Sequence, residues 1–419
     1  MTLSTRFIDE FFRLVGRQDA LGISRLLNIK NAQYTNIYFK EDAMKYLDSK
    51  LSNSPNEMVN WGEVFQYYIL ARNSLFTQDF SNTFEFLTKS FKSLIELIKD
   101  AKDENWQLPV LFRVSVDLRL LAYVCDSKKQ KQQLIETSSK DTGEGGSSED
   151  NEYAEKTAEC LMLSFRNLCT DTRSDSQVSK RWGMMHIVNQ LFKIYFKINK
   201  INLCNPLKRV IENSGLKDSF PRSHQIVYKF YVGRQAMFEN DYETASAYFD
   251  YAFKNCPARY KKNKKIILVY LIPVNMLRGY MPKQNLLLKY DLKPFVEIVN
   301  AVKQGNILKF NRDMLEYEDF FIENGVYLFL EKLKMTTYRN LFKTLARLLN
   351  TAQIPIDALV DILKFLGEDD MDNDVCQCIL SNLIYEGKIK GYISQKHNKL
   401  VISKDFKVAF PRLSTIQQG

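Results

Sequence analysis

The chain has 419 residues, 45% of them hydrophobic and 26% charged, with only 16 glycines and 10 prolines. So few turn-forming residues argue against an all-β protein and favour helices, and no stretch reaches the roughly 18–20 apolar residues that a membrane-spanning helix needs. Lysine and arginine outnumber aspartate and glutamate by 59 to 49. This mild excess fits either simple solubility or contact with nucleic acid or an acidic partner, depending on whether the basic residues cluster.

Residues 1–126 show apolar side chains at helical spacing and are predicted to form N-terminal helical repeats. Phe7, Phe11, Phe12 and Leu14 share one face of a first helix. A long apolar segment begins near residue 106, where Pro109 suits the first turn of a helix because its missing N–H costs nothing there.

Residues 127–152 differ sharply in composition, being polar, rich in Ser and Gly and almost free of large apolar side chains. They are predicted to be a disordered acidic Gly/Ser insert, because they bury too little surface to offset the entropy of ordering. Gly143, Gly145 and Gly146 do not indicate a phosphate-binding loop, since no strand precedes them and no Lys-Ser/Thr pair follows.

Residues 153–330 return to helical periodicity. Residues 227–257 resemble a tetratricopeptide hairpin, with small Ala245 and Ala252 at packing positions, a turn at Asn240-Asp241 and a closing Pro257. Such a helix pair cannot bury its apolar face alone. Stacked helical hairpins are therefore expected through this part of the chain.

Residues 331–404 have the element order of a winged helix. A helix at 338–350 is followed by a short extended bridge, a helix from a capping Asp357 to Leu366, and a third helix at 375–385 that Gly387 ends in a left-handed conformation. Two β-like runs follow at 388–394 and 399–403, and 405–419 form a C-terminal tail. The predicted fold is all-α: a right-handed superhelix of tetratricopeptide-like hairpins ending in a winged helix.

Several longer strings accompany this order of elements. They include Glu104-Asn-Trp-Gln-Leu-Pro-Val110, Tyr228-Lys-Phe-Tyr-Val-Gly-Arg234 and Gly391-Tyr-Ile-Ser394. Together they resemble the PCI-domain family, which supplies scaffolds of the proteasome lid, the signalosome and a translation initiation factor. Within that family the chain is most similar to the PCI-domain-containing subunits of the transcription-and-export complex 2.

The resemblance implies a non-catalytic scaffold subunit of a nuclear complex that couples transcription to mRNA export. It also implies a larger helical PCI-type partner, of the germinal-centre-associated nuclear protein type, and a small acidic disordered subunit. The expected location is the nucleus, including the nuclear pore, with a cytoplasmic pool allowed. The alternative is a PCI scaffold subunit of a proteasome-lid or signalosome-like assembly that has only protein partners.

Basic residues cluster in three places, which makes non-specific binding of RNA or single-stranded nucleic acid a candidate activity. One cluster is an expected loop at 259–265, read either as a solvated linker or as a contact for phosphate or an acidic partner. The others are the first helix of the winged helix and its β-hairpin. The candidate nucleic-acid-binding residues are Lys388, Lys390, Lys396, Lys399, Lys334, Arg339, Lys343, Arg259, Lys261, Lys262, Lys264 and Lys265.

The third helix of the winged helix is the element that would enter a DNA major groove. Residues 375–385 contain no Lys or Arg, and carboxylates precede them, so sequence-specific DNA reading is not expected. In the hairpin, Tyr392 either offers a stacking face to a base or packs in the core beside solvated lysines. The hairpin also offers an edge for pairing with a second winged helix.

No enzyme, cofactor or metal site is expected. None of the three histidines has a second His or Cys at ligand spacing, and His186 is interpreted as a core residue. Cys376 and Cys378 stand about 200° apart around their helix, so they do not converge on one metal. No nucleophile elbow appears. The seven scattered cysteines indicate reduced thiols in the cytosol or nucleus.

Overall fold

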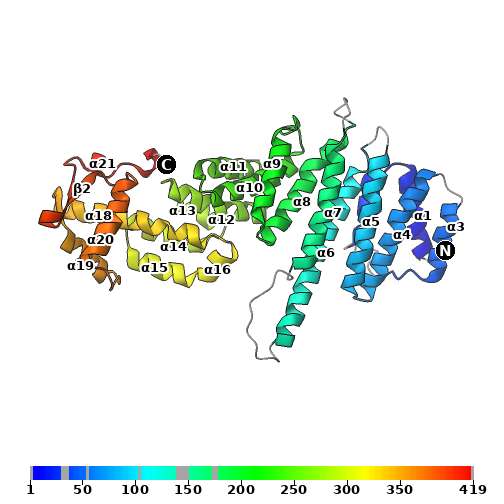
Figure 1. Cartoon of the computed structure of the whole chain (residues 1–419), viewed down its shortest axis with the longest axis horizontal. Helices are drawn as coiled ribbons and strands as arrows, with labels where there is room; N and C mark the ends of the chain where they lie inside the picture. The colour runs from blue at the N-terminus through cyan, green and yellow to red at the C-terminus, as the bar shows by residue number, and fades with distance from the viewer. Residues whose placement is uncertain are drawn as a thin grey trace. The chain divides into compact units, whose positions relative to one another are not determined.

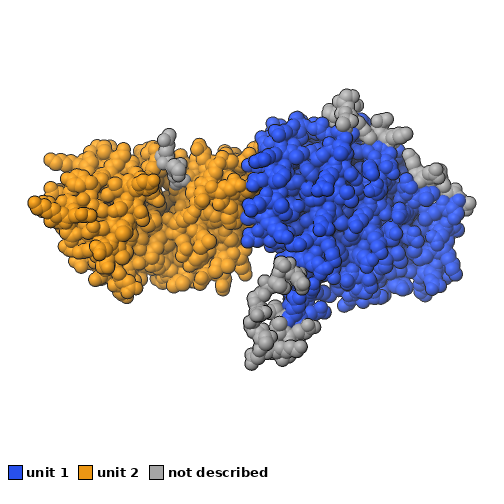
Figure 2. Space-filling view, in the orientation of Figure 1, with its two compact units in different colours: residues 1–228 blue, residues 229–419 orange. Residues whose placement is uncertain are grey.

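The computed structural model describes residues 3–29, 37–52, 56–101, 105–137, 151–171 and 178–416. The chain divides into two compact units, Met1–Tyr228 (unit 1) and Lys229–Gly419 (unit 2), shown in Figure 2. Helices make up most of the described residues, and none of these helices is both long enough and apolar enough to cross a membrane.

Unit 1 is built from helices that pack against their neighbours in sequence, most extensively α4 against α5 (Figure 1). Short 3-10 turns at Lys180–Gly183 and Ile201–Leu203 precede α8 and α9. The helices of unit 1 are α1 (Leu3–Gly16), α2 (Ala20–Leu26), α3 (Glu41–Ser52), α4 (Asn56–Phe76), α5 (Phe80–Asp100), α6 (Leu108–Thr137), α7 (Glu152–Cys169), α8 (Met184–Lys197) and α9 (Cys204–Glu212), and α10 (Arg222–Phe238) crosses from unit 1 into unit 2.

An aromatic cluster holds the first helices of unit 1 together. The rings of Phe11 and Phe65 stack with centroids 3.9 Å apart, and the Phe7 ring is also stacked on Phe65, with centroids 5.7 Å apart. Phe12 and Leu14 are buried as well, which confirms the apolar face predicted for the first helix.

The same turn chemistry ends one helix and starts the next at three hairpins. In each, a residue with positive φ is followed by an Asp whose carboxylate accepts a hydrogen bond from the backbone N–H three residues later, which stabilises the start of the new helix. The pairs are Gln18–Asp19 and Gln78–Asp79 in unit 1 and Asn240–Asp241 in unit 2.

The region of the predicted insert differs from the prediction. Helix α6 runs to Thr137 and α7 begins at Glu152, so residues 127–137 are helical; residues 138–150, with all three glycines of the insert, lie outside the described residues. The Asp126 carboxylate accepts from the N–H groups of Tyr153 and Ala154 at 3.0 and 3.1 Å. These two hydrogen bonds join α6 to α7 inside unit 1. The boundary between the compact units lies within α10 and not at 127–152.

Unit 2 continues with helical hairpins and ends in a small sheet with helices around it. Gly233 in α10 lets α11 approach closely, since a Cβ there would lie 3.0 Å from the Phe249 ring. Its further elements are α11 (Tyr242–Asn255), α12 (Lys261–Leu277), α13 (Gln284–Lys289), α14 (Lys293–Gln304), α15 (Ile307–Glu316), α16 (Glu318–Glu323), α17 (Tyr327–Glu331), α18 (Leu333–Leu349), β1 (Gln353–Pro355), α19 (Ile356–Phe365), α20 (Asn373–Tyr385), β2 (Gly391–Ser394), β3 (Lys399–Ile402) and α21 (Phe406–Ala409).

The last elements form a winged helix. The sheet has strand order β1-β3-β2 with both pairs antiparallel, and Ile354 and Ile393 both pair with Leu400 of the central strand. The predicted all-α fold of helical hairpins ending in a winged helix is thereby confirmed. One detail is corrected: Asp357 lies inside the first turn of α19 and does not cap it, because Pro355 holds the cap position.

The C-terminal segment belongs to the winged helix and is not a free tail. Ala409 and Phe410 are buried in its core, and the N–H of Lys390 donates to the carbonyl of Ala409 at 2.8 Å. Arg339 on α18, only 4% exposed, donates to the carbonyls of Lys388 and Pro411 and lies over the Phe410 ring. One buried guanidinium therefore joins α18, the start of the hairpin and the C-terminal segment.

A half-buried polar network joins α6, α8 and α10 within unit 1. Ser115 Oγ lies 3.2 Å from His186 Nε2, and His186 Nδ1 lies 3.4 Å from His224 Nε2. The two histidines are 38 residues apart, so their spacing in the sequence gave no sign of this contact. Burial, then His224 and Lys193, lower the pKa of His186 to about 3. Burial, and then Lys193, lower the pKa of His224 to about 4.

These depressed histidine pKa values predict that unit 1 loses stability in mild acid. Below pH 6.5 the two histidines are protonated in the unfolded chain and remain neutral in the folded state. The free energy of unfolding present above pH 6.5 therefore falls as pH decreases, by about 2 kcal/mol per histidine at pH 5. Urea unfolding followed by tryptophan fluorescence measures this, because all three tryptophans lie in unit 1. H186Q/H224Q should flatten the pH dependence. The exposed His397 provides a control, and an equal effect of H397Q would contradict the explanation.

The Arg339 contacts predict a local loss of stability in Arg339→Met. Two backbone carbonyls lose their hydrogen-bond donor, and each buried group left unsatisfied lowers the free energy of unfolding by about 1–3 kcal/mol. Hydrogen exchange read by mass spectrometry should show faster exchange in peptides covering residues 388–416. Arg347→Met on the same helix, at an exposed position, should leave exchange unchanged, and similar protection in both variants would contradict the role assigned to Arg339.

Candidate nucleic-acid interface

The β-hairpin of the winged helix presents one side chain face to solvent. On β3 Leu400 and Ile402 are buried, so Lys399 and Val401 lie on the opposite face. Tyr392 on β2 is the cross-strand partner of Val401 and is 62% exposed. The alternative in which Tyr392 packs in the core is therefore wrong, and its ring is open to a stacking partner.

Basic side chains surround this face. Lys390 and Lys396 are exposed and Lys399 is half-buried. Lys404 and Lys407, which sequence reasoning missed because they fall in the assumed tail, are also exposed, and the segment that carries them is bonded to Lys390 through Ala409. The wing patch is defined as these residues: Lys390, Tyr392, Lys396, Lys399, Lys404 and Lys407.

None of the five lysines of the wing patch forms an ion pair with another residue that the structure describes. Their charges are consequently available to a phosphate backbone, which binds exposed ammonium groups by releasing counterions.

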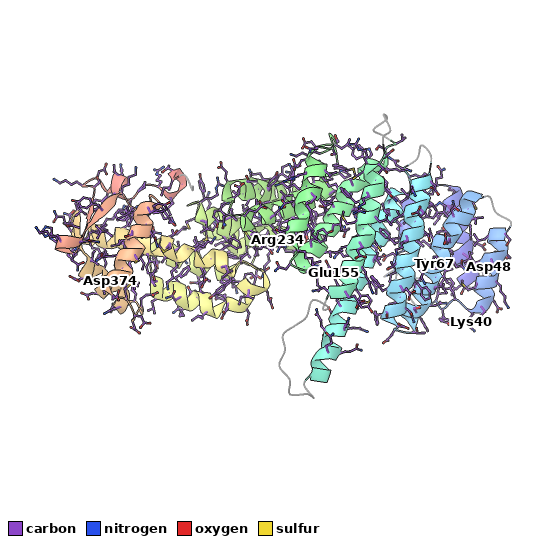
Figure 3. All side chains as sticks on the ribbon, viewed as in Figure 1. Lys40, Asp48, Tyr67, Glu155, Arg234 and Asp374 are labelled. Atoms are coloured by element: carbon purple, nitrogen blue, oxygen red, sulfur yellow. The ribbon has the colours of Figure 1, made fainter. Side chains whose placement is uncertain are left out.

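The third helix, α20, presents a different surface. Asp372 caps its N-terminus and Asp374 follows in the first turn, at the lower edge of α20 in Figure 3. The Asp357 carboxylate joins them by accepting from Asn373 at 3.1 Å and from Asn398 at 3.0 Å. These carboxylates would repel phosphate where a groove-reading helix has to approach, so the geometry disfavours DNA reading by α20.

Several predicted residues are engaged within the fold. Lys334 pairs with Glu368 at 2.7 Å and Lys388 with Glu386 at 2.6 Å. Burial, together with Arg339 and Arg347, lowers the pKa of Lys343. The predicted role of Arg339 in nucleic-acid binding is wrong, because its buried guanidinium donates to the backbone carbonyls described above. Burial lowers the pKa of Arg339 to about 10, so it stays charged at neutral pH.

The second cluster lies at the start of α12: Arg259 belongs to the turn before the helix, as the expected loop allows, whereas residues 261–265 are helical and not in a loop. Arg259, Lys261 and Lys262 are exposed, and the Arg259 guanidinium lies 4.8 Å from the centre of the Tyr260 ring. These four residues are named the α12 patch. The positive end of the helix dipole adds to their charge.

The other two basic residues of this cluster are used internally. Lys264 is buried and donates to the carbonyl of Phe253 at 2.8 Å, so its predicted role in binding is corrected. Lys265 pairs with Asp291 at 3.1 Å.

The wing patch and the α12 patch are separate surfaces. Helix α12 has 17 residues and is therefore roughly 25 Å long. Gly279, just beyond its C-terminal end, lies against Leu413 of the C-terminal segment, since a Cβ on Gly279 would be 2.5 Å from that side chain. The α12 patch sits at the far end of the helix from this contact.

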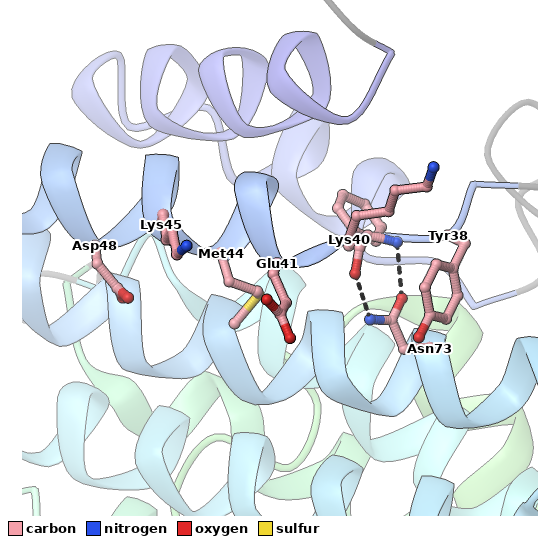
Figure 4. A pocket seen from close by; sticks show the side chains of 8 residues that line it. Tyr38, Lys40, Glu41, Met44, Lys45, Asp48 and Asn73 are labelled. Carbon is pink, nitrogen blue, oxygen red and sulfur yellow. Dashed lines mark hydrogen bonds between the residues drawn. The ribbon is translucent and has the colours of Figure 1, made fainter.

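Unit 1 has a cavity of about 570 Å³ beside the start of α3 (Figure 4). Asn73 exchanges two hydrogen bonds with the backbone of Phe39 at its edge, at 2.8 and 2.9 Å. Of its charged lining residues, Lys40 precedes α3, and Glu41, Lys45 and Asp48 come from one face of that helix. None of the described residues that line it is a His or a Cys. The cavity shows no nucleophile and base within reach of each other.

Metal ligands do not gather in the part of the chain that the structure describes, where no group of three or more His, Cys, Asp or Glu side chains has the arrangement to hold an ion. Cys376 is buried and Cys378 is exposed, which confirms that the two thiols face different sides of their helix.

Comparison with known proteins agrees with this architecture. Residues 314–404 match the PCI domain family. The chain is 43% identical to PCI domain-containing protein 2 of Xenopus laevis, over 85% of this chain and 86% of the relative. It is 38% identical to the Danio rerio protein of the same name over 98% of each chain, and 45% identical to the Drosophila melanogaster homolog over 74% of this chain and 75% of that relative. Nothing in these matches points to an enzymatic activity. The chain belongs to the family of PCI domain-containing protein 2 homologues.

Proposed function

We propose that this chain is a non-catalytic scaffold subunit of a nuclear complex that couples transcription to mRNA export, and that it contacts RNA through the wing patch. The observation that carries the RNA contact is the combination of an exposed Tyr392 with lysines of the hairpin and of the segment after it that form no ion pair with the described residues. Aromatic stacking and a positively charged surface are what sequence-independent binding of single strands requires.

The α12 patch supports a second contact. Exposed Arg259, Lys261 and Lys262 at the positive end of a helix suit either RNA phosphates or the carboxylates of a small acidic disordered subunit. The larger helical PCI-type partner would bind elsewhere on the scaffold. The alternative of a lid-type or signalosome-like scaffold with protein partners only would leave the wing patch without an RNA ligand.

The wing patch predicts a salt-dependent RNA affinity that K390E/K396E/K399E reduces. Anisotropy of a labelled 20-nucleotide single-stranded RNA, measured between 50 and 200 mM salt, should show at least a tenfold loss of affinity at the low-salt end. The salt slope should fall by about 2, because each lost phosphate contact removes about 0.7 from it.

The matched control is K40E/K45E/K92E, which changes the net charge equally at exposed positions of unit 1. It should leave RNA affinity within a factor of two or three. Equal losses in the two triple variants would mean that only net charge matters, and an unchanged affinity in the wing variant would exclude the wing patch.

Substitutions of Tyr392 test the contribution of base stacking to RNA affinity separately from the contribution of the lysine charges. Tyr392→Ala should weaken RNA binding about five- to tenfold, the lower part of the 1–3 kcal/mol range for one stacked base, and should leave the salt slope unchanged. Tyr392→Trp should retain affinity. Because the side chain is exposed, circular dichroism should show no change in fold, and equal affinities of all three proteins would rule out stacking.

A further inference from the structure

Helices α15 and α16 act as one nearly continuous helix along an edge of unit 2 (Figure 1). The N–H of Tyr317 donates to the carbonyl of Asp313 at 3.2 Å, and the N–H of Phe321 donates to that of Tyr317 at 3.1 Å, so four-residue helical hydrogen bonds end and begin again at Tyr317, the one residue between the two helices. The inner face, with Ile307, Phe310, Met314 and Phe321, is buried against the unit.

The outer face of the same helices carries large apolar side chains at a regular interval. Leu308, Leu315 and Ile322 are 54%, 67% and 56% exposed and are spaced seven residues apart. On a regular helix each step of seven falls about 20° short of two turns, so Leu308 and Leu315 of α15 lie about 20° apart around their axis. Ile322 takes the next heptad position on α16. This is the heptad spacing with which one helix receives another.

The surface continues at its N-terminal end into the winged helix. A Cβ on Gly367 would lie 3.2 Å from Leu308 Cδ1, and Asn311 donates to Glu368 at 2.9 Å. Phe365, two residues before Gly367, is 84% exposed. We name Leu308, Leu315, Ile322 and Phe365 the α15–α16 stripe.

The charge beside this stripe is negative although the whole chain is basic. Between residues 307 and 323 there are five carboxylates and two basic side chains. Both basic side chains are paired, Lys309 with Glu297 at 2.6 Å and Arg312 with Asp313 at 3.1 Å. Glu316, Asp319 and Glu323 are exposed next to the stripe, and Asp369 and Asp370 are exposed beyond Phe365.

We propose that the α15–α16 stripe docks an amphipathic helix of a partner protein whose apolar residues repeat every seven positions and are flanked by Lys or Arg. The carboxylates fit basic flanks, and they repel both nucleic acid phosphates and anionic lipid headgroups. A second copy of this chain would bring a matching set of carboxylates against them. The proposal uses neither basic patch and stands independently of the RNA contact.

The test uses the full chain and two synthetic helical peptides of three heptads. One has Leu at the a and d positions with Lys at e and g; the other has Glu at e and g. Fluorescence anisotropy at physiological salt should show at least tenfold tighter binding of the Lys peptide. L315S/I322S should weaken that binding at least tenfold, and L203S/L288S, which changes two exposed leucines elsewhere, should not.

Equal binding of the two peptides, or equal binding by the stripe variant and the unchanged protein, would overturn the proposal. So would a concentration-dependent dimer, measured by light scattering, that L315S/I322S abolishes, because the surface would then belong to a second copy. RNA affinity measured on the stripe variant should be unchanged, which keeps a failure here distinct from a failure of the RNA contact.

Discussion

The position of the hairpin that carries the wing patch depends on one buried cation. Arg339 donates to the carbonyl of Lys388, just before the hairpin, and to that of Pro411 in the C-terminal segment. A buried guanidinium is tolerated only when its donors are satisfied. Here two backbone carbonyls accept from it, so three segments distant in sequence are joined, and the segment that carries Lys407 is bonded to Lys390 through Ala409.

Unit 2 separates its charges by element, which suits a scaffold with several ligands. The hairpin and the start of α12 present ammonium and guanidinium groups, α20 presents carboxylates at its N-terminus, and α15–α16 present apolar side chains beside carboxylates. Surfaces of opposite sign repel each other's ligands, so one unit can hold an acidic and a basic partner without exchange. The net charge of +10 does not show that basic and acidic side chains lie on different elements of unit 2.

The sequence predicted the elements of the fold well because apolar periodicity and turn residues are local signals. The face of Phe7 and Phe11, the turn at Asn240-Asp241 and the left-handed Gly387 are all present. The sequence could not predict which basic side chains are available to a ligand, because that depends on contacts with residues distant in the sequence. Lys265 forms an ion pair with Asp291, Lys334 forms one with Glu368, and the Arg339 guanidinium donates a hydrogen bond to the C-terminal segment. Composition also misled at 127–137, which is polar yet helical, because a solvated helix needs no apolar face along its whole length.

The central claim is that RNA meets the scaffold on the hairpin face of the winged helix. Ultraviolet crosslinking of the endogenous protein with its bound partners, followed by mass spectrometry of nucleotide-bearing peptides, tests it most directly. The account predicts adducts on peptides containing residues 390–407, with Tyr392 among the modified positions, together with co-purifying mRNA-export proteins. Adducts confined to α20 or to unit 1, or an absence of adducts together with co-purifying lid-type subunits, would contradict it.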